Sequence, residues 1–417
     1  MRILILGAGN CQLNLIRKAR AMGHQVIVSD YLPDAPGKKL ADFSTSVSSF
    51  DWQGNLKVAQ QYEVEAVLTT GTDQPVYTAA QIAAALEIPH YITPQIALSV
   101  TNKRIMKQKF TQAGIPTVKY KLLQTNFSDA ELTDFKLPIV VKPVDSQGQR
   151  GVYKLDSIEE LRAKFSEVLA FSRENRLLVE EYYPAAEITV SGWVRQGRLH
   201  LLTVTDRINF ARGNHLGICS SHLFPSRYLK SNYLAINELS ENIVTEFKIN
   251  NGPIYFQFLL GQAGLKVNEI AVRIGGAYED IFIPALTGVD ILKLNLKLAV
   301  GEAISSSELA SLNNYQLLNN KSWLSAQLFF SQAGKIVDQT PAAELMNLAG
   351  VLKADYNFKP GDQLAEIDNA TARAGYFLVK AAGEKELRQR IAAVYDKLEI
   401  IDQQGKNLVL RQLGENF

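Results

Sequence analysis

The stretch Ile254–Gly276, IYFQFLLGQAGLKVNEIAVRIGG, decides the fold of this 417-residue chain. It is typical of two strands joined by a tight turn, because strand-forming residues flank a short segment at positions 262–264. If those three residues form the loop, with the glycine left-handed, Gln257 lies directly opposite Glu269. Side chains along a strand alternate between two faces, so Arg273 points the same way as Glu269.

This face of the expected hairpin carries an unusual combination of polar groups. Opposed strand residues have Cβ atoms roughly 5 Å apart, close enough for Gln257 and Glu269 to share a divalent cation. A guanidinium beside that oxygen pair suits a metal-bound triphosphate better than a buried core, where unpaired charge is costly. We therefore expect the chemistry of the protein at this hairpin.

Composition bounds the remaining possibilities. The chain is long enough for two to four units, and 47% hydrophobic residues with a net charge of +2 indicate a globular protein without an electrostatic sign of nucleic acid. Two cysteines suggest a reducing compartment, and the five histidines have no metal-ligand spacing. No apolar run approaches the roughly 20 residues that span a bilayer. We expect a cytoplasmic protein that binds neither membrane nor nucleic acid.

The first hundred residues alternate strand and helix patterns, which favours a parallel sheet with helices on both faces. Gly7 and Gly9 follow the apolar strand 2–6, and Asp30 comes about 20 residues later, as in a dinucleotide-binding fingerprint. The third glycine position holds Gln12, so a plain strand-to-helix turn is the favoured interpretation. A nicotinamide oxidoreductase stays as an alternative.

Three further features precede the hairpin. A helix over 102–113 carries Lys103, an apolar strand delivers Lys142 into a polar loop over 145–151, and another apolar strand leads to Glu180. Lysines suit phosphates, and a loop with free N–H groups can close over them. A carboxylate at a strand edge can accept the adenine amino group, while metal oxygens bridge β- and γ-phosphates. The order predicts a nucleotide site.

Four motifs in this order resemble the ATP-grasp superfamily over roughly residues 1–305: NKRIMKQKF, VVKPVDSQGQRGV, LLVEEYYPAAEITVSG and YFQFLLGQAGLKVNEIAVRIGG. The resemblance implies an α/β fold: a Rossmann-like N-terminal domain, an ATP-grasp fold of two α+β subdomains and a small C-terminal α+β domain. The expected boundaries are 1–100, 101–178, 179–305 and 306–417. Residues 303–320, rich in serine and asparagine, are expected to be a linker.

The resemblance also implies roles for individual residues. ATP is expected to bind through Lys103, Lys142, Ser146, Gly148, Arg150, Gly151, Glu180, Glu181, Tyr182, Tyr183 and Glu187. In that set the lysines contact the α- and β-phosphates, the loop 146–151 covers the triphosphate, residues 180–183 bind adenine, and Glu187 binds the ribose. Gln257 and Glu269 are expected to hold Mg²⁺ or Mn²⁺, and Arg273 and Lys142 to act in catalysis.

Two departures from the superfamily pattern qualify this expectation. Many relatives carry asparagine two residues after the second metal carboxylate, where this chain has Ala271. The phosphate loop is also poor in glycine, and Arg150 is expected to contact phosphate in place of some backbone amides. These departures motivate a second alternative, a non-catalytic ATP-binding protein.

The run E-I-x-x-R-I-G-G resembles the stand-alone carboxylate–amine ligases that join amino acids, and the tail motif at 373–376 resembles their C-terminal domain. The expected activity is ATP-dependent formation of a C–N bond between a small-molecule carboxylate and an amine, through an acyl phosphate. A bicarbonate-using ATP-grasp carboxylase is the third alternative, and a homodimer is a common state of such ligases. Expected substrate contacts are Arg207, His222, Gly275, Gly276 and Asp73.

Some of these residues have plainer interpretations. Arg207 can be a surface charge, and Arg273 can pair structurally with Asp280 or Glu279. The two glycines at 275 and 276 can simply end a strand.

Overall fold

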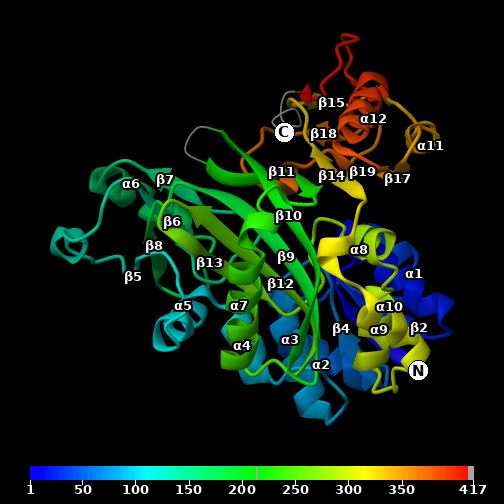
Figure 1. The fold of residues 1–417 in the computed structure, drawn as a ribbon, viewed down its shortest axis with the longest axis horizontal. Coiled ribbons are helices and arrows are strands. Elements are labelled where there is room, and N and C mark those ends of the chain that lie inside the picture. Colours follow the sequence, from blue (N-terminus) through cyan, green and yellow to red (C-terminus); the bar gives the residue numbers. More distant parts are fainter. Residues whose placement is uncertain (213–214, 412–417) are drawn as a thin grey trace.

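The computed structural model describes residues 1–212 and 215–411 and combines a parallel N-terminal sheet with a much larger mixed sheet (Figure 1). The N-terminal sheet has the strand order β3-β2-β1-β4, and its strand pairs are parallel, as the alternating pattern predicts. Its elements are β1 (Arg2–Leu6), α1 (Leu13–Ala21), β2 (Gln25–Ser29), β3 (Phe43–Thr45), α2 (Trp52–Gln61), β4 (Ala66–Leu68), α3 (Gln74–Leu86) and α4 (Pro94–Thr101).

The glycine turn after β1 is filled by protein side chains. Gln12 packs its amide against Gly7 and donates from Nε2 to the Thr70 carbonyl at 2.5 Å. The Asp30 carboxylate accepts from the Ala8 amide at 2.8 Å. Both groups occupy the turn where a dinucleotide fingerprint would place a pyrophosphate, which favours the structural interpretation.

Within the described ranges, the large sheet has twelve strands and carries most of the remaining chain. Nine of them follow the order β13-β12-β9-β10-β11-β7-β6-β8-β5, while β14 pairs with β11 and leads through β19 to β17. The strands are β5 (Tyr120–Leu123), β6 (Ile139–Pro143), β7 (Tyr153–Leu155), β8 (Leu177–Glu181), β9 (Ala185–Arg195), β10 (Arg198–Arg212), β11 (His215–Phe224), β12 (Asn251–Gly261), β13 (Gly264–Ala271), β14 (Trp323–Phe329), β17 (Val351–Tyr356) and β19 (Gly375–Ala381).

Helices cover this sheet, and short strand pairs complete the C-terminal region. The helices are α5 (Lys103–Gln112), α6 (Ile158–Leu169), α7 (Leu229–Glu246), α8 (Glu279–Thr287), α9 (Ile291–Ala299), α10 (Ser306–Asn314), α11 (Ala342–Met346) and α12 (Glu384–Lys397). The short strands are β15 (Gly334–Lys335), β16 (Asp338–Gln339), β18 (Gln363–Leu364) and β20 (Ile400–Ile401). The C-terminal part lies beside α8, which contacts β14 (Figure 1).

The expected linker at 303–320 is wrong, because this segment contains α10. Ser305 and Glu308 form a capping box that starts the helix. Leu309 and Leu312, three residues apart, then reach the main hydrophobic core. The serine-rich composition reflects the cap and the exposed face.

The hairpin β12–β13 has the expected pairing of Gln257 with Glu269, but by a different route. Gly261 pairs with Gly264, so the loop has two residues, and a register shift after Gln257 leaves Asn268 as an extra residue. Gly264 has φ +87°, the expected left-handed conformation. The bulge adds the one residue that the shorter loop lacks, so the predicted register survives.

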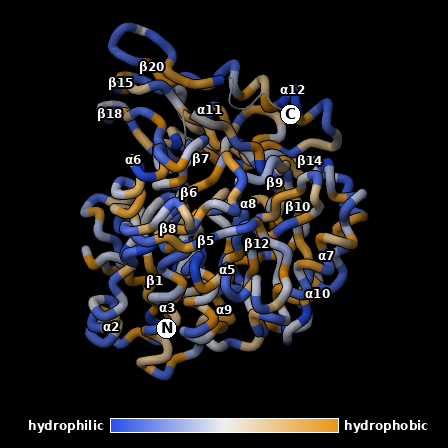
Figure 2. The backbone as a smooth tube through the Cα atoms, turned by 90° about the vertical axis from the view of Figure 1, so that its left-hand side faces the viewer, coloured by the Kyte–Doolittle hydropathy of each residue, from blue (hydrophilic) through white to orange (hydrophobic). Residues whose placement is uncertain are grey.

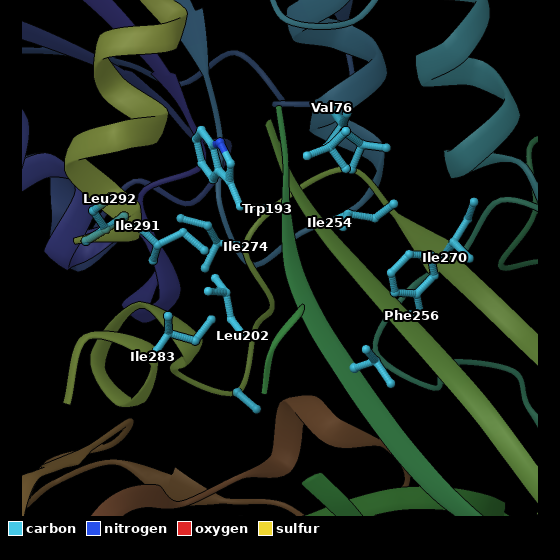
Figure 3. Close-up of a cluster of buried hydrophobic side chains, with 14 of the residues drawn as sticks. Val76, Trp193, Leu202, Ile254, Phe256, Ile270, Ile274, Ile283, Ile291 and Leu292 are labelled. Atoms are coloured by element: carbon cyan, nitrogen blue, oxygen red, sulfur yellow. The ribbon is translucent and has the colours of Figure 1, made fainter. Parts of the chain in front are cut away.

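The opposite face of this hairpin is anchored in the core. Ile254, Phe256 and Ile270 belong to the main hydrophobic core and lie on one side of the sheet in Figure 3, with Val76 near Ile254. Hydrophobic and hydrophilic stretches are interspersed along the coloured part of the tube in Figure 2. Among the described residues, no helix is both long and apolar enough to cross a membrane. A rigid apolar underside therefore holds the polar face in place.

Candidate functional site

Most residues expected to bind the nucleotide converge on one cavity of about 480 Å³. Its walls come from α5, β6 and the loop after it, β8, β9, β10 and the β12–β13 hairpin. The expected residues that line it are Lys103, Lys142, Ser146, Gly148, Arg150, Glu180, Glu181, Tyr182, Tyr183, Glu187, Gln257, Glu269, Asp73 and Arg207. Gly151, His222, Arg273, Gly275 and Gly276 are not part of this lining.

Glu180 lies between two buried lysines. Its carboxylate is 2.5 Å from Lys142 Nζ and 2.7 Å from Lys107 Nζ. Burial alone would raise the pKa of Glu180, but the two ammonium groups outweigh it and hold that pKa at about 2. Glu180 is therefore charged and serves first as the counter-ion of these lysines.

Lys107 is the functional candidate that motif reasoning missed. Its side chain is 1% exposed and also donates to Thr117 Oγ1 at 2.6 Å. Burial lowers the pKa of Lys107 to about 8, although Glu180 opposes the shift. The available signal was its position four residues after Lys103, on the same face of α5.

Gln257 and Glu269 present the oxygen atoms that suit a hard cation. Gln257 donates from Nε2 to Glu187 at 2.7 Å, so its Oε1 remains as an acceptor. Burial would raise the pKa of Glu269, but Lys103, Lys142, Arg207 and Arg273 together lower it, so this group is a carboxylate. No group of three or more His, Cys, Asp or Glu within the described ranges is arranged to hold a metal. The pair fits Mg²⁺ that draws its other ligands from phosphate and water.

The loop over 145–151 is tied to its surroundings at several points, among them the Asp145 carboxylate, which accepts from Arg173 Nε at 2.8 Å. The Ser146 carbonyl accepts from Lys103 Nζ at 2.9 Å. Gln147 Oε1 accepts from the Asp73 amide at 2.7 Å, at the start of α3. The Gly148 carbonyl accepts from the Ala370 amide of the C-terminal region at 3.2 Å. Arg150 donates from Nε to the Gln147 carbonyl at 3.2 Å, so the side chain folds onto its own loop.

Arg273 pairs with Asp73, two hundred residues earlier in the chain. Its Nε donates to Asp73 Oδ1 at 2.7 Å and its Nη2 approaches the same oxygen at 2.5 Å. Its Nη1 donates to the Ile274 carbonyl at 3.0 Å. The alternative pairing with Asp280 or Glu279 is wrong, because the N-terminal region supplies the partner.

The glycines after Arg273 allow two parts of the protein to approach closely. A Cβ on Gly276 would lie 2.6 Å from the Gly71 carbonyl oxygen, and one on Gly275 would lie 2.1 Å from Glu279 Oε1. The Gly71 amide donates to the Ile274 carbonyl at 3.1 Å. Glu279 is fully buried, and burial raises its pKa to about 7. The interpretation that these two glycines simply end a strand does not account for this close packing.

Arg207 and His222 are cross-strand partners on β10 and β11, and both are buried. Arg207 donates from Nη1 to Glu187 at 2.8 Å, which rules out the interpretation as a surface charge. His222 Nδ1 lies 3.1 Å from Thr205 Oγ1, and burial together with nearby Arg207 lowers its pKa to about 3. His222 is therefore neutral, and it is buried outside the cavity lining.

Two family sequence models match the chain in separate places. The ATP-grasp domain matches residues 135–279, and the L-amino acid ligase C-terminal domain 2 matches residues 327–402. The chain therefore contains an ATP-grasp domain, and the relatives and solved structures that it resembles are C–N bond-forming enzymes. Its C-terminal region is of the L-amino acid ligase type.

Similar proteins agree with that placement. The chain is 21% identical to dapdiamide A synthase of Enterobacter agglomerans, covering 94% of this chain and 95% of the relative. It is 23% identical to an L-arginine-specific L-amino acid ligase of Bacillus subtilis, covering 72% and 71%.

Solved structures share the fold at lower identity. The L-amino acid ligase from Bacillus licheniformis superposes with a TM-score of 0.80 at 18% identity, covering 96% of this chain and 98% of that one. The N5-carboxyaminoimidazole ribonucleotide synthetase from Thermotoga maritima superposes with a TM-score of 0.71 at 16% identity, covering 96% of this chain and 99% of that one.

Proposed function

We propose that this protein joins the carboxylate of one amino-acid-like substrate to the amine of another and releases ADP and phosphate. The observation that carries this proposal is that Lys103, Lys142 and Arg207 line one cavity together with the Gln257–Glu269 pair. Cationic side chains beside an oxygen pair that suits a divalent cation fit a metal-bound polyphosphate. The likeness to dapdiamide A synthase over nearly the full chain supports the choice of amino-acid-like substrates.

The proposed reaction has two steps. A substrate carboxylate oxygen attacks the γ-phosphorus of ATP, the bond to the bridging oxygen breaks, and an acyl phosphate and ADP form. The amine nitrogen then attacks the acyl carbon, the bond to phosphate oxygen breaks, and the amine loses a proton. Activation is needed because a carboxylate is a poor electrophile, whereas phosphate is a good leaving group.

The residues of this chain then have distinct tasks. Lys103 and Lys142 neutralise phosphate oxygens, and residues 180–183 together with Glu187 hold the nucleoside. Gln257 Oε1 and Glu269 would hold Mg²⁺, which when bound supplies charge neutralisation to the phosphates. The loop over 145–151 keeps water from the acyl phosphate, because it is fixed to both neighbouring regions.

The first test is ADP release from MgATP in the presence of pooled amino acids, pooled small carboxylic acids or bicarbonate. Stimulation by the amino acid pool, lost in Glu269→Gln, is the expected result, and dividing the pool then identifies the substrates. Glu246→Gln, at the exposed end of α7, is the matched control and keeps wild-type turnover.

Other outcomes would select the alternatives. Stimulation by bicarbonate alone would favour a carboxylase and contradict the amino acid proposal. Tight ATP binding without turnover in any pool would favour a non-catalytic nucleotide-binding protein.

A further inference from the structure

Arg207 is a buried arginine on the cavity wall that keeps unused hydrogen-bond donors. Its side chain is 6% exposed. Nη1 donates to Glu187 and Asn209, and Nη2 donates to the Gly217 carbonyl at 3.3 Å. Within residues 1–212 and 215–411, its Nε–H has no protein acceptor. A guanidinium has five N–H donors, so Arg207 can still bind an oxyanion while Glu187 holds it in place.

Arg273 is in the opposite situation. Its Nε and Nη2 are both directed at Asp73, and Nη1 donates to a backbone carbonyl. Arg273 also lies outside the cavity lining, although its charge reaches Glu269. The edge of the guanidinium that forms bidentate contacts is therefore already occupied.

The neighbouring charges indicate which anion Arg207 would meet. Glu187, its partner, also accepts from Gln257, which is paired with Glu269 across the hairpin. Arg207 and Gln257 therefore share Glu187 as a hydrogen-bond acceptor, and Gln257 with Glu269 provides the oxygen pair that suits a divalent cation. A phosphoryl group bound by that cation is the nearest anion for the unused donors.

We propose that Arg207, and not Arg273, contacts the terminal phosphoryl group of the bound nucleotide, while Arg273 holds the N-terminal region through Asp73. This inference rests on the proposed function, because it assumes a nucleoside triphosphate in the cavity. Arg207 is then a catalytic residue that touches the transferred group, and Arg273 is a positioning residue.

The test measures affinity for MgADP and for the magnesium complex of a non-hydrolysable β,γ-imido ATP analogue, by titration calorimetry on the full chain. Arg207→Gln is expected to weaken analogue binding about 10-fold or more, the effect of losing a charge-assisted contact. Its affinity for MgADP stays within about twofold of wild type, because the diphosphate lacks the contacted group. Arg273→Gln lowers the melting temperature and changes both affinities by the same factor.

Two further variants control the comparison. Arg198→Gln lies at the exposed far end of the same strand and leaves both affinities unchanged. Arg207→Lys keeps the positive charge opposite Glu187 but loses the planar guanidinium with its paired N–H donors. This variant replaces Arg207→Gln in the experiment if Arg207→Gln does not fold. A selective loss of analogue affinity of more than about threefold in Arg207→Lys then supports the proposal.

Several results would overturn the proposal that Arg207 contacts the terminal phosphoryl group. Equal changes in both affinities, or none, in the Arg207 variant contradict a terminal phosphoryl contact, as does a selective loss in Arg273→Gln. Unchanged nucleotide affinities with a raised KM for the amino acid would assign Arg207 to a substrate carboxylate instead. Binding of neither nucleotide by the wild-type chain would overturn the proposed function itself, and this proposal with it.

Discussion

At the scale of single residues, the cavity depends on buried charges that stabilise one another. Lys107, Lys142 and Glu180 form a compact group in which each charge offsets the cost of burying the next. Such a group is weak evidence for stability, because its desolvation is expensive, but removing one member leaves an uncompensated charge. The group therefore reports on both folding and nucleotide binding.

Lys107→Met tests this group. We expect a loss of about 3 kcal/mol in the free energy of unfolding, measured with urea, because Glu180 keeps only one cationic partner. The pKa of Glu180 should rise. In the wild-type protein the folded pKa of Glu180 lies below its unfolded pKa, so the stabilising contribution of Glu180 is present at neutral pH and is lost on acidification. In the variant the folded pKa is higher, so stability should be lost at a higher pH than in wild type.

The matched control is Lys109→Met, two positions along the same helix. Lys109 is half-buried and lies over the Phe247 ring, 4.4 Å from its centroid. Replacing Lys109 should lower the free energy of unfolding by less than about 1 kcal/mol. Equal losses in the two variants would contradict a special role for Lys107.

Glu279 makes the opposite pH prediction. Its folded pKa of about 7 lies above the ordinary value of 4.5, so the folded state holds the proton more tightly. Its contribution to stability is present below about pH 4.5 and is lost as pH rises through 7, at a cost of roughly 3 kcal/mol. Glu279→Gln should therefore raise the melting temperature relative to wild type more at pH 8 than at pH 5. A difference independent of pH would contradict the raised pKa.

At the scale of elements, the close contact between Gly276 and Gly71 links the hairpin strand to the loop after β4. Gly276→Ala would place a methyl group 2.6 Å from a backbone oxygen that has little room to move. We expect a loss of about 2 kcal/mol in unfolding free energy. Gly383→Ala, at the N-cap of α12 with open space around it, should lower the free energy of unfolding by less than about 1 kcal/mol.

Local patterns predicted the elements that carry the nucleotide residues, because strands and turns follow short-range rules. The pairing of Gln257 with Glu269 could be read from the spacing alone. The bulge at Asn268 could not, since a two-residue loop with a bulge and a three-residue loop give the same pairing. The helix over Ser306–Asn314 was missed because serine and asparagine suggested a linker, although the capping box was present in the sequence.

Contacts between segments that are distant in the chain could not be predicted from the sequence. Nothing near Arg273 indicates that its partner is Asp73, because ion pairs have no periodicity. The burial of Lys107 likewise depends on where β8 places Glu180. Site residues within one motif were thus predictable, whereas their partners from other regions were not.

At the scale of the whole molecule, the Asp73–Arg273 pair joins the N-terminal region to the hairpin. A double-mutant cycle with Asp73→Asn and Arg273→Gln measures this link. We expect each single change to cost about 3 kcal/mol, and the double change to cost clearly less than the sum, because no buried charge is left unpaired. Additive losses in urea unfolding would show that the two side chains act independently.

The loop over the cavity has one further consequence, which concerns exchange of parts between related proteins. Its contact with the C-terminal region runs from the Gly148 carbonyl to the Ala370 amide, so it uses main-chain atoms only. The side chain at position 370 is therefore free to vary without loss of the bond, and proline alone among the common residues would remove the donor. A chimera that imports a foreign C-terminal domain can keep this anchor if it preserves the backbone path there and has any residue other than proline at this position.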